Sequence, residues 1–362
     1  MEMNKKAWNK IANMVFIEQP AGVGFSTTDS SIDYNDDQAA EDNLKFVKGF
    51  LAKFPMFKQR DFYLSSESYG GHYLPTLAWK LVQDGSIPNF KGFLVGNPLT
   101  YMPYRNYGQY ATFAWHQFVP KPLWDQYEKL GCDLSDKTNQ TACDEVTSEM
   151  DNLVSDLDPY ALDFPICTDP SKAAGREERM ALLKKISLAG RNMKMAKHLL
   201  SVQSRYTTKG YKPCIDNYMT DYLNRKDVQA AIHVKQPGTI SWAVCNDTVN
   251  MDYSIDDVNA PMMDFYKRLV GHGGLKLLVY SGDDDSVCAT VGAQMWIWDT
   301  FGKEVEKWKP WYVNKQVAGY TVEFPGFRFA TVHGAGHMVP STQPVRALAL
   351  FSNYLEDKWE ST

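Results

Sequence analysis

The sequence predicts an α/β protein in which a mainly parallel sheet is covered by helices on both faces. Short apolar runs of the kind found in strands buried on both faces recur along the chain, and they are separated by stretches long enough for helices. Glycine-containing turns follow several of these runs. The predicted strands are residues 13–17, 62–64, 93–95, 275–280 and 327–332.

The first part of the chain has the pattern of strand, turn and helix. The strand predicted at 13–17 precedes Gln19-Pro-Ala-Gly-Val-Gly24, in which proline and glycine force a turn. Residues 40–51 then carry apolar side chains at steps of four, three and four, the spacing of one helical face. A second helix is predicted at 71–81, directly after the strand at 62–64.

Strand-like runs become rare between residues 116 and 212, where we predict an inserted, mostly helical lid. The predicted core therefore consists of residues 1–115 and 213–362. Within the lid, residues 131–163 hold nine Asp or Glu and one Lys, whereas residues 171–212 hold eleven Lys or Arg and two Glu. These two halves either pair with each other or form two separate solvated helical faces.

Composition limits the possible partners. The chain has 362 residues and a net charge of -5, so no overall positive field attracts nucleic acid or anionic lipid. No apolar run reaches the roughly 18 residues needed to span a membrane, and residues 1–10 lack the apolar stretch of a secretory signal. We expect neither nucleic-acid nor membrane binding, and the composition leaves the oligomeric state open.

The segment Ser66-Glu-Ser-Tyr-Gly-Gly71 lies between a predicted strand and a predicted helix, the setting of a nucleophile elbow. Ser68 would occupy the sharp turn, and Gly70 supplies the small residue that the turn needs two positions later. Ser66 replaces the glycine usual two positions earlier, so the pattern is S-x-S-x-G instead of G-x-S-x-G.

Two later segments supply the partners of a catalytic serine. Residues 283–285 are three aspartates after one predicted strand, and His337 follows the last predicted strand. The order Ser68, Asp285, His337 is that of the α/β-hydrolase fold. In this arrangement His337 takes the Ser68 proton, while Asp285 fixes the imidazole tautomer and stabilises the imidazolium.

These segments resemble the motifs of the serine carboxypeptidase family. The resemblance lies in Glu67-Ser-Tyr-Gly-Gly-His-Tyr-Leu-Pro75, Gly282-Asp-Asp-Asp-Ser-Val-Cys288 and Gly334-Ala-Gly-His-Met-Val-Pro340, and also in 222–229 and 242–245. It runs from Trp8 to the C-terminus and selects Asp285 from the three acids. The resemblance implies an enzyme that removes C-terminal residues from peptides with a free C-terminus and needs no cofactor or metal. It also implies a location in the secretory pathway, the vacuole or lysosome, or the extracellular space.

The resemblance also assigns roles to two glutamates. Glu18 and Glu67 match a carboxyl pair that recognises the free carboxylate of the substrate. Two close carboxyls share a proton because double ionisation is repulsive, and the protonated one donates a hydrogen bond to an anion. Binding should weaken once the pair ionises, so we expect an acidic pH optimum.

One family motif has no match in this sequence. Family members carry W-x-N-G-G-P-G-C-S-S shortly before the segment matching Trp8, and its backbone amide completes the oxyanion hole. Without it the Tyr69 N–H is the remaining donor, and the first strands of the sheet are expected to be missing. Loss of one oxyanion donor typically costs about a hundred- to a thousandfold in rate. An inactive, truncated form is therefore one alternative to the peptidase. The resemblance leaves a second, an acyltransferase, because some relatives use the same triad to move an acyl group from a sugar ester to an alcohol.

Six cysteines without CxxC spacing or nearby histidine pairs argue against zinc and favour disulfides. By resemblance, Cys132–Cys143 and Cys167–Cys214 are disulfides and Cys288 is a free thiol near the site. The partner of Cys245 would be the cysteine of the motif that has no match in this sequence; a Cys214–Cys245 bridge is the alternative. Asn139 and Asn246 lie in N-x-T sequons and are candidate glycosylation sites.

Overall fold

The computed structural model describes residues 3–28, 32–134, 139–168 and 211–359 and contains a mixed sheet at its centre. Within these residues the sheet has six strands in the order β1-β2-β3-β6-β5-β4. The first four in this order are parallel, and β5 and β4 are antiparallel to their neighbours. The strands are β1 (Phe62–Glu67), β2 (Phe90–Gly96), β3 (Lys276–Gly282), β4 (Glu306–Val313), β5 (Gln316–Phe324) and β6 (Phe327–Val332).

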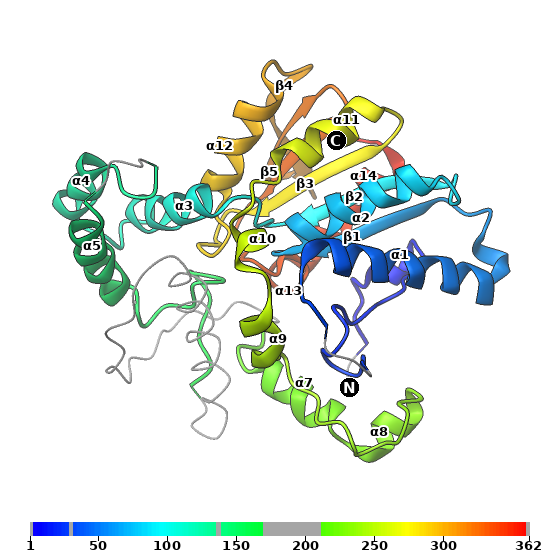
Figure 1. The fold of residues 1–362 in the computed structure, drawn as a ribbon. Helices are drawn as coiled ribbons and strands as arrows, with labels where there is room; N and C mark the ends of the chain where they lie inside the picture. Colours follow the sequence, from blue (N-terminus) through cyan, green and yellow to red (C-terminus); the bar gives the residue numbers. More distant parts are fainter. Residues whose placement is uncertain (1–2, 29–31, 135–138, 169–210, 360–362) are drawn as a thin grey trace.

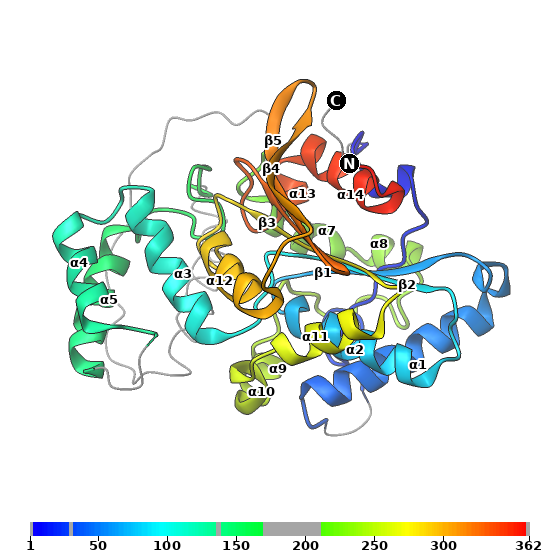
Figure 2. The same cartoon turned by 90° about the horizontal axis from the view of Figure 1, so that it is seen from above.

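Helices cover both faces of this sheet, which confirms the predicted architecture (Figures 1 and 2). The larger helices are α1 (Asp36–Lys53), α2 (Gly70–Asp84), α3 (Met102–Trp115), α4 (Lys121–Leu130), α5 (Gln140–Leu153), α7 (Ile215–Leu223), α11 (Met263–His272), α12 (Thr290–Phe301) and α14 (Pro344–Glu356). Shorter ones are η1 (Trp8–Lys10), η2 (Pro55–Phe57), α8 (Lys226–Ala231), α9 (Asp247–Asp252), α10 (Ile255–Asn259) and α13 (Val339–Thr342).

Side chains alternate between two hydrophobic cores, one on each face of the sheet. In β2, Phe93 and Val95 pack with α1, α2, α11 and α12, whereas Leu94 points to the opposite face. There α14 closes the second core, and Trp8 stacks on Phe351 with ring centroids 4.2 Å apart. Figure 2 shows α1, α2 and α11 on one side of the sheet and α14 on the other.

The prediction of a buried strand at 13–17 is wrong. These residues form no strand, and Phe16 is 87% exposed. An apolar run becomes a strand only where a neighbouring strand pairs with its backbone, and among the described residues β1, at the edge of this sheet, pairs only with β2. The other four predicted strands are present as β1, β2, β3 and β6.

The antiparallel hairpin of β4 and β5 was not anticipated from the sequence. Its two-residue turn places Asn314 and Lys315 at φ 52° and 61°, the left-handed conformation that tight hairpins require. The turn contains asparagine but no glycine, so it lacks the strongest hairpin signal.

Helices α3, α4 and α5 lie to one side of the sheet (Figure 1) and share a third hydrophobic cluster. Tyr127 and Met150 are fully buried within it. Of these helices, α4 and α5 lie within the predicted lid, whereas α3 precedes its predicted start; the lid and its boundaries at 116 and 212 stay predictions. The basic half of the lid lies almost wholly outside the described residues, so the question of charge pairing stays open.

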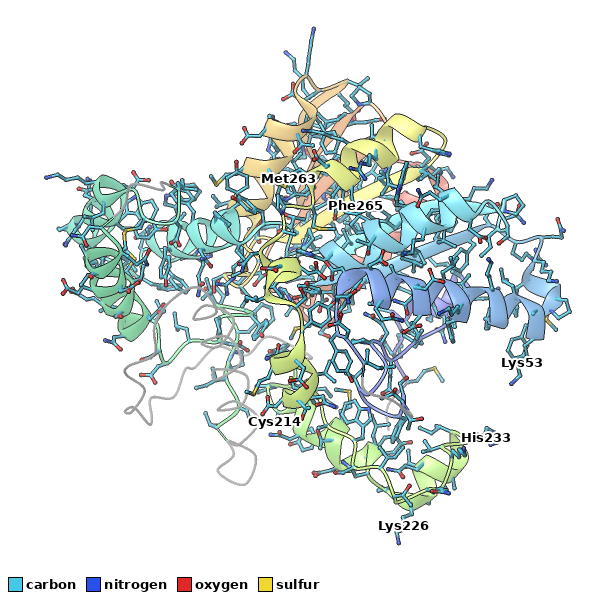
Figure 3. The ribbon with its side chains drawn as sticks, viewed as in Figure 1. Lys53, Cys214, Lys226, His233, Met263 and Phe265 are labelled. Carbon is cyan, nitrogen blue, oxygen red and sulfur yellow. A yellow bond between two sulfur atoms is a disulfide. The ribbon has the colours of Figure 1, made fainter. Side chains whose placement is uncertain are left out.

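Helices α7, α8 and α9 form a second group that extends from the core, below the sheet in the view of Figure 1. In Figure 3, Cys214 lies at the start of α7, and Lys226 and His233 lie at the outer end of this extension. Met263 and Phe265 of α11 instead pack against the sheet core. Across the described residues we find no helix long and apolar enough to cross a bilayer.

Candidate active site

Ser68 lies at the turn between β1 and α2, where its φ of 62° places a non-glycine residue in the left-handed region. The Ser68 N–H donates to the Gly96 carbonyl, and the Ser68 carbonyl accepts from Gly71 and Leu99. Such strain persists only where surrounding contacts enforce it, and it often marks a functional residue.

The neighbouring small residues make the turn possible. A Cβ on Gly70 would lie 2.3 Å from the Ser66 hydroxyl, and one on Gly71 would lie 2.1 Å from the Leu99 carbonyl oxygen. The serine that departs from the usual pattern thus packs directly against Gly70. This arrangement accommodates Ser66 only because position 70 has no side chain.

Asp285 and His337 are joined by a buried hydrogen bond, 2.7 Å between Oδ2 and Nδ1. Asp285 is completely buried and His337 is 3% exposed. The Asp285 carboxylate also accepts from Asn97 Nδ2 at 2.8 Å, Val287 N at 2.7 Å and Cys288 N at 3.2 Å. These donors compensate the charge of a carboxylate held away from water.

The other two acids of this loop have different partners. Asp283 accepts hydrogen bonds from His333 Nδ1 and Gly334 N. Asp284 is 2% exposed and accepts from the Asp163 N–H through both oxygens. Burial raises the pKa of Asp284 to about 8. Only Asp285 of the three bonds to His337.

Two further titratable groups are shifted by this environment. Burial raises the pKa of Glu67 to about 7, although His337 acts in the opposite direction. Burial lowers the pKa of His337, but the charge and hydrogen bond of Asp285 outweigh it and leave the pKa above 6.5. These mutual effects bring Glu67, His337 and Asp285 into one electrostatic unit.

The structure does not join Ser68 and His337 by a hydrogen bond; the Ser68 side chain instead contacts the buried thiol of Cys288. Burial raises the pKa of that thiol, and its hydrogen bond with Ser68 works against the rise. The Tyr69 N–H, at the start of α2, donates to none of the other described residues. Helix N-termini favour anions, so this N–H is available to an oxyanion.

The carboxyl of Glu18 is held by a separate set of contacts. Oε1 accepts from Trp242 Nε1 at 2.6 Å, and Oε2 accepts from Phe25 N at 2.5 Å. Gly24 permits this wrapping, because a Cβ there would lie 2.2 Å from Oε1. Glu18 and Glu67 make no hydrogen bond with each other in the structure, so the predicted carboxyl pair is not seen as a direct contact.

The structure contains the two disulfides implied by the resemblance, Cys132–Cys143 and Cys167–Cys214. The alternative Cys214–Cys245 bridge is therefore not formed. Asn139 caps α5 through a bond from Ala142 N.

At the other sequon, the Asn246 amide nitrogen donates to the Gly22 carbonyl at 2.8 Å. Glycosylation at both asparagines stays a prediction.

Three residues that bond to groups of the site, Asn97, Arg105 and Trp242, were not predicted as site residues from the sequence. Asn97 follows β2, and a polar residue at the carboxyl end of a parallel strand is a usable signal. Arg105 is 5% exposed and donates to the Val287 carbonyl of the aspartate loop. Nothing in the local sequence distinguishes Arg105 from a structural residue. Trp242 lies in segment 242–245, which resembles the family, but the resemblance gave it no role at the site.

Comparison with known proteins agrees with this geometry. The chain matches the profile of the serine carboxypeptidase family (Peptidase_S10) over residues 1–357. Serine carboxypeptidase 24 of Arabidopsis thaliana is 36% identical over 367 residues, covering 98% of this chain and 75% of the relative. Serine carboxypeptidase-like 26 of Oryza sativa subsp. japonica is 33% identical over 369 residues, covering 98% and 73%.

Among solved structures, a prohormone-processing carboxypeptidase of Saccharomyces cerevisiae, Kex1(delta)p, superimposes with a TM-score of 0.72 at 18% identity. The match covers 98% of this chain and 76% of the yeast chain, and it identifies the α/β-hydrolase fold. With the profile match over nearly the whole length, the chain belongs to the serine carboxypeptidase family.

Proposed function

We propose that this protein is a serine-type carboxypeptidase that releases C-terminal residues from peptides through an acyl-enzyme on Ser68. The observation that carries the proposal is the buried Asp285–His337 hydrogen bond beside a serine in a strained turn. Family membership supports peptidase chemistry, since relatives bear the name serine carboxypeptidase.

In the first half of the reaction His337 accepts the Ser68 proton as Ser68 Oγ attacks the scissile carbonyl carbon. Asp285 stabilises the imidazolium that forms, and His337 then delivers the proton to the leaving amino acid. In the second half a water molecule attacks the ester, His337 again takes and returns the proton, and the shortened peptide leaves. The Tyr69 N–H donates to the carbonyl oxygen while it carries negative charge.

Glu67, with Glu18, is proposed to recognise the free carboxylate of the substrate. A pKa of about 7 keeps Glu67 largely protonated in mild acid, so that it donates a hydrogen bond to an anion. Glu18 already accepts hydrogen bonds at both oxygens. We therefore assign the proton to Glu67 and an orienting role to Glu18.

This assignment predicts an acidic optimum. Glu67 must be protonated, which holds below about pH 7, and His337 must be neutral to act as base. Ionised Glu67 raises the pKa of His337, so protonation of Glu67 shifts that pKa downward, while the Asp285 carboxylate continues to raise it. Substrate binding should therefore weaken as the pH rises through 7. A flat profile from acid to alkaline pH would contradict this role.

We also propose folding in the secretory pathway, with residence in a vacuole, lysosome or the extracellular space. Two disulfides support an oxidising compartment.

The direct test is labelling of the purified chain with a fluorophosphonate, with Ser68→Ala as the control. Labelling that depends on Ser68, with release of the C-terminal residue from a blocked dipeptide near pH 5, is the expected result. Transfer of an acyl group to an alcohol without peptide cleavage would favour the acyltransferase. A folded chain that neither labels nor turns over would favour an inactive form.

A further inference from the structure

A short segment outside the sheet, residues 158–164, lies against both loops that carry the triad partners of Ser68; we call it the clasp. It follows α5 and precedes the Cys167–Cys214 disulfide. Its apolar residues are enclosed, with Ala161 at 0% and Leu162 at 4% exposure. Ala161, Leu162 and Phe164 therefore anchor the clasp in the protein interior, whereas residues 158–160 are half-buried and Asp163 is exposed.

Four hydrogen-bond contacts join the clasp to the aspartate loop. The Pro159 carbonyl accepts from Ser286 N at 3.0 Å and from Ser286 Oγ at 2.7 Å. The Leu162 N–H donates to the Asp284 carbonyl at 3.1 Å, and the Asp163 N–H donates to the Asp284 carboxylate. Because Ser286 and Asp284 flank Asp285, the clasp fixes the backbone on both sides of this acid.

The same segment holds the histidine loop. The His337 N–H donates to the Tyr160 carbonyl at 2.6 Å, and the Tyr160 ring meets the imidazole edge to face, with centroids 5.2 Å apart. A Cβ on Gly336 would lie 2.3 Å from the Tyr160 carbonyl oxygen and 2.6 Å from the Ala161 Cβ. The clasp can approach the histidine loop this closely because residue 336 has no side chain.

These contacts have a consequence for the reaction. The Asp285–His337 hydrogen bond depends on the relative placement of two loops that are far apart in sequence. The clasp touches both loops at once, and a displacement of about 1 Å at such a site can cost about a hundredfold in rate. A segment that sets this placement would affect proton transfer without contacting the substrate.

We propose that the clasp positions the triad, with Tyr160 as the residue that orients His337 relative to Asp285. The proposal rests on the proposed function of the triad, but it makes a separate statement about residues 158–164. Tyr160 is a positioning residue in this account, because it acts through His337.

The test compares Tyr160→Ala, Tyr160→Phe and Gly336→Ala with wild type. The variant Tyr160→Ala removes the ring, Tyr160→Phe keeps it, and Gly336→Ala drives a methyl group toward the Tyr160 carbonyl. Gly271→Ala is the matched control, because a Cβ there meets nothing within 4 Å. Each variant is compared in thermal unfolding, rate of Ser68 phosphonylation, kcat and KM, and the low-field proton signal of His337 Nδ1–H, assigned with His337→Gln.

We expect Tyr160→Ala and Gly336→Ala to lower the phosphonylation rate and kcat by about ten- to a hundredfold, with KM near wild type. The low-field signal should broaden or disappear in both. Tyr160→Phe and Gly271→Ala should match wild type. A folded Tyr160→Ala protein with wild-type rate and signal would overturn the proposal.

Should Tyr160→Ala fail to fold, Ser286→Ala decides the question, because it removes one side-chain bond to Pro159 and leaves the backbone bond in place. A smaller decrease in the same quantities is expected, and unchanged values would count against the clasp. The proton signal requires no turnover. A wild-type protein that shows the signal but cleaves no peptide would refute the proposed peptidase function while the clasp is still tested.

Discussion

Replacing Glu67 by glutamine should change the stability of the protein in a pH-dependent way. Burial raises the pKa of Glu67 from 4.5 to about 7. In the unfolded chain this carboxyl ionises near its ordinary pKa, whereas in the folded protein it stays protonated until the pH approaches 7. The folded state therefore loses stability as the pH rises from about 4.5 to 7, and the loss is constant above that range.

The gap between the two pKa values corresponds to about 3 kcal/mol, since one pKa unit equals 1.36 kcal/mol. Glu67 keeps part of its surface accessible, so water reduces this figure and we expect about 2–3 kcal/mol. Glutamine cannot ionise and removes the penalty. The free energy of unfolding of Glu67→Gln, relative to that of wild type, should therefore be about 2–3 kcal/mol higher at pH 8 than at pH 4.

The assay is urea unfolding of wild type and Glu67→Gln at both pH values without reducing agent. Any change in packing or hydrogen bonding that does not depend on pH cancels in the difference between the two pH values. The exposed Glu149→Gln variant is the control and should show no comparable difference. Equal effects of Glu67→Gln at pH 4 and pH 8 would refute the reasoning.

Three further substitutions test single contacts of the site. Asn97→Ala removes a donor from the buried Asp285 carboxylate and should lower kcat about ten- to a hundredfold with little change in KM, measured by steady-state kinetics. Trp242→Phe removes the donor to Glu18 and should raise KM about tenfold with kcat nearly constant; an equal loss in kcat would speak against carboxylate orientation. Gly70→Ala should slow phosphonylation of Ser68 because of the contact with Ser66, and adding Ser66→Gly should restore the rate; no recovery would contradict this account of the turn.

Much of the site could be predicted because its residues follow strands directly. Ser68 follows β1, the three aspartates follow β3, and His337 comes shortly after β6. Carboxyl ends of adjacent parallel strands meet at one edge of a sheet, so local patterns were enough to bring these segments together. The choice of Asp285 came from resemblance, and the structure supplies a geometric reason for it, the bond to His337.

The remaining features depend on contacts between distant segments. An apolar pattern at 13–17 predicted a strand, but strand formation needs a paired neighbour, which no local pattern can reveal. The clasp could not be predicted, because its main contacts with the two loops are backbone carbonyls and N–H groups, which every residue type carries. Arg105 is buried and donates to the Val287 carbonyl, a contact that is likewise set by tertiary packing.

We propose that Ser68 performs acyl transfer on a substrate recognised by its free carboxylate. The most direct measurement is kcat/KM at pH 5 for a blocked dipeptide and for the same dipeptide with a C-terminal amide, using wild type and Ser68→Ala. We expect Ser68-dependent release of the C-terminal residue with a strong preference for the free acid, and a loss of that preference in Glu67→Ala. Equal rates for acid and amide, or release that persists in Ser68→Ala, would contradict it.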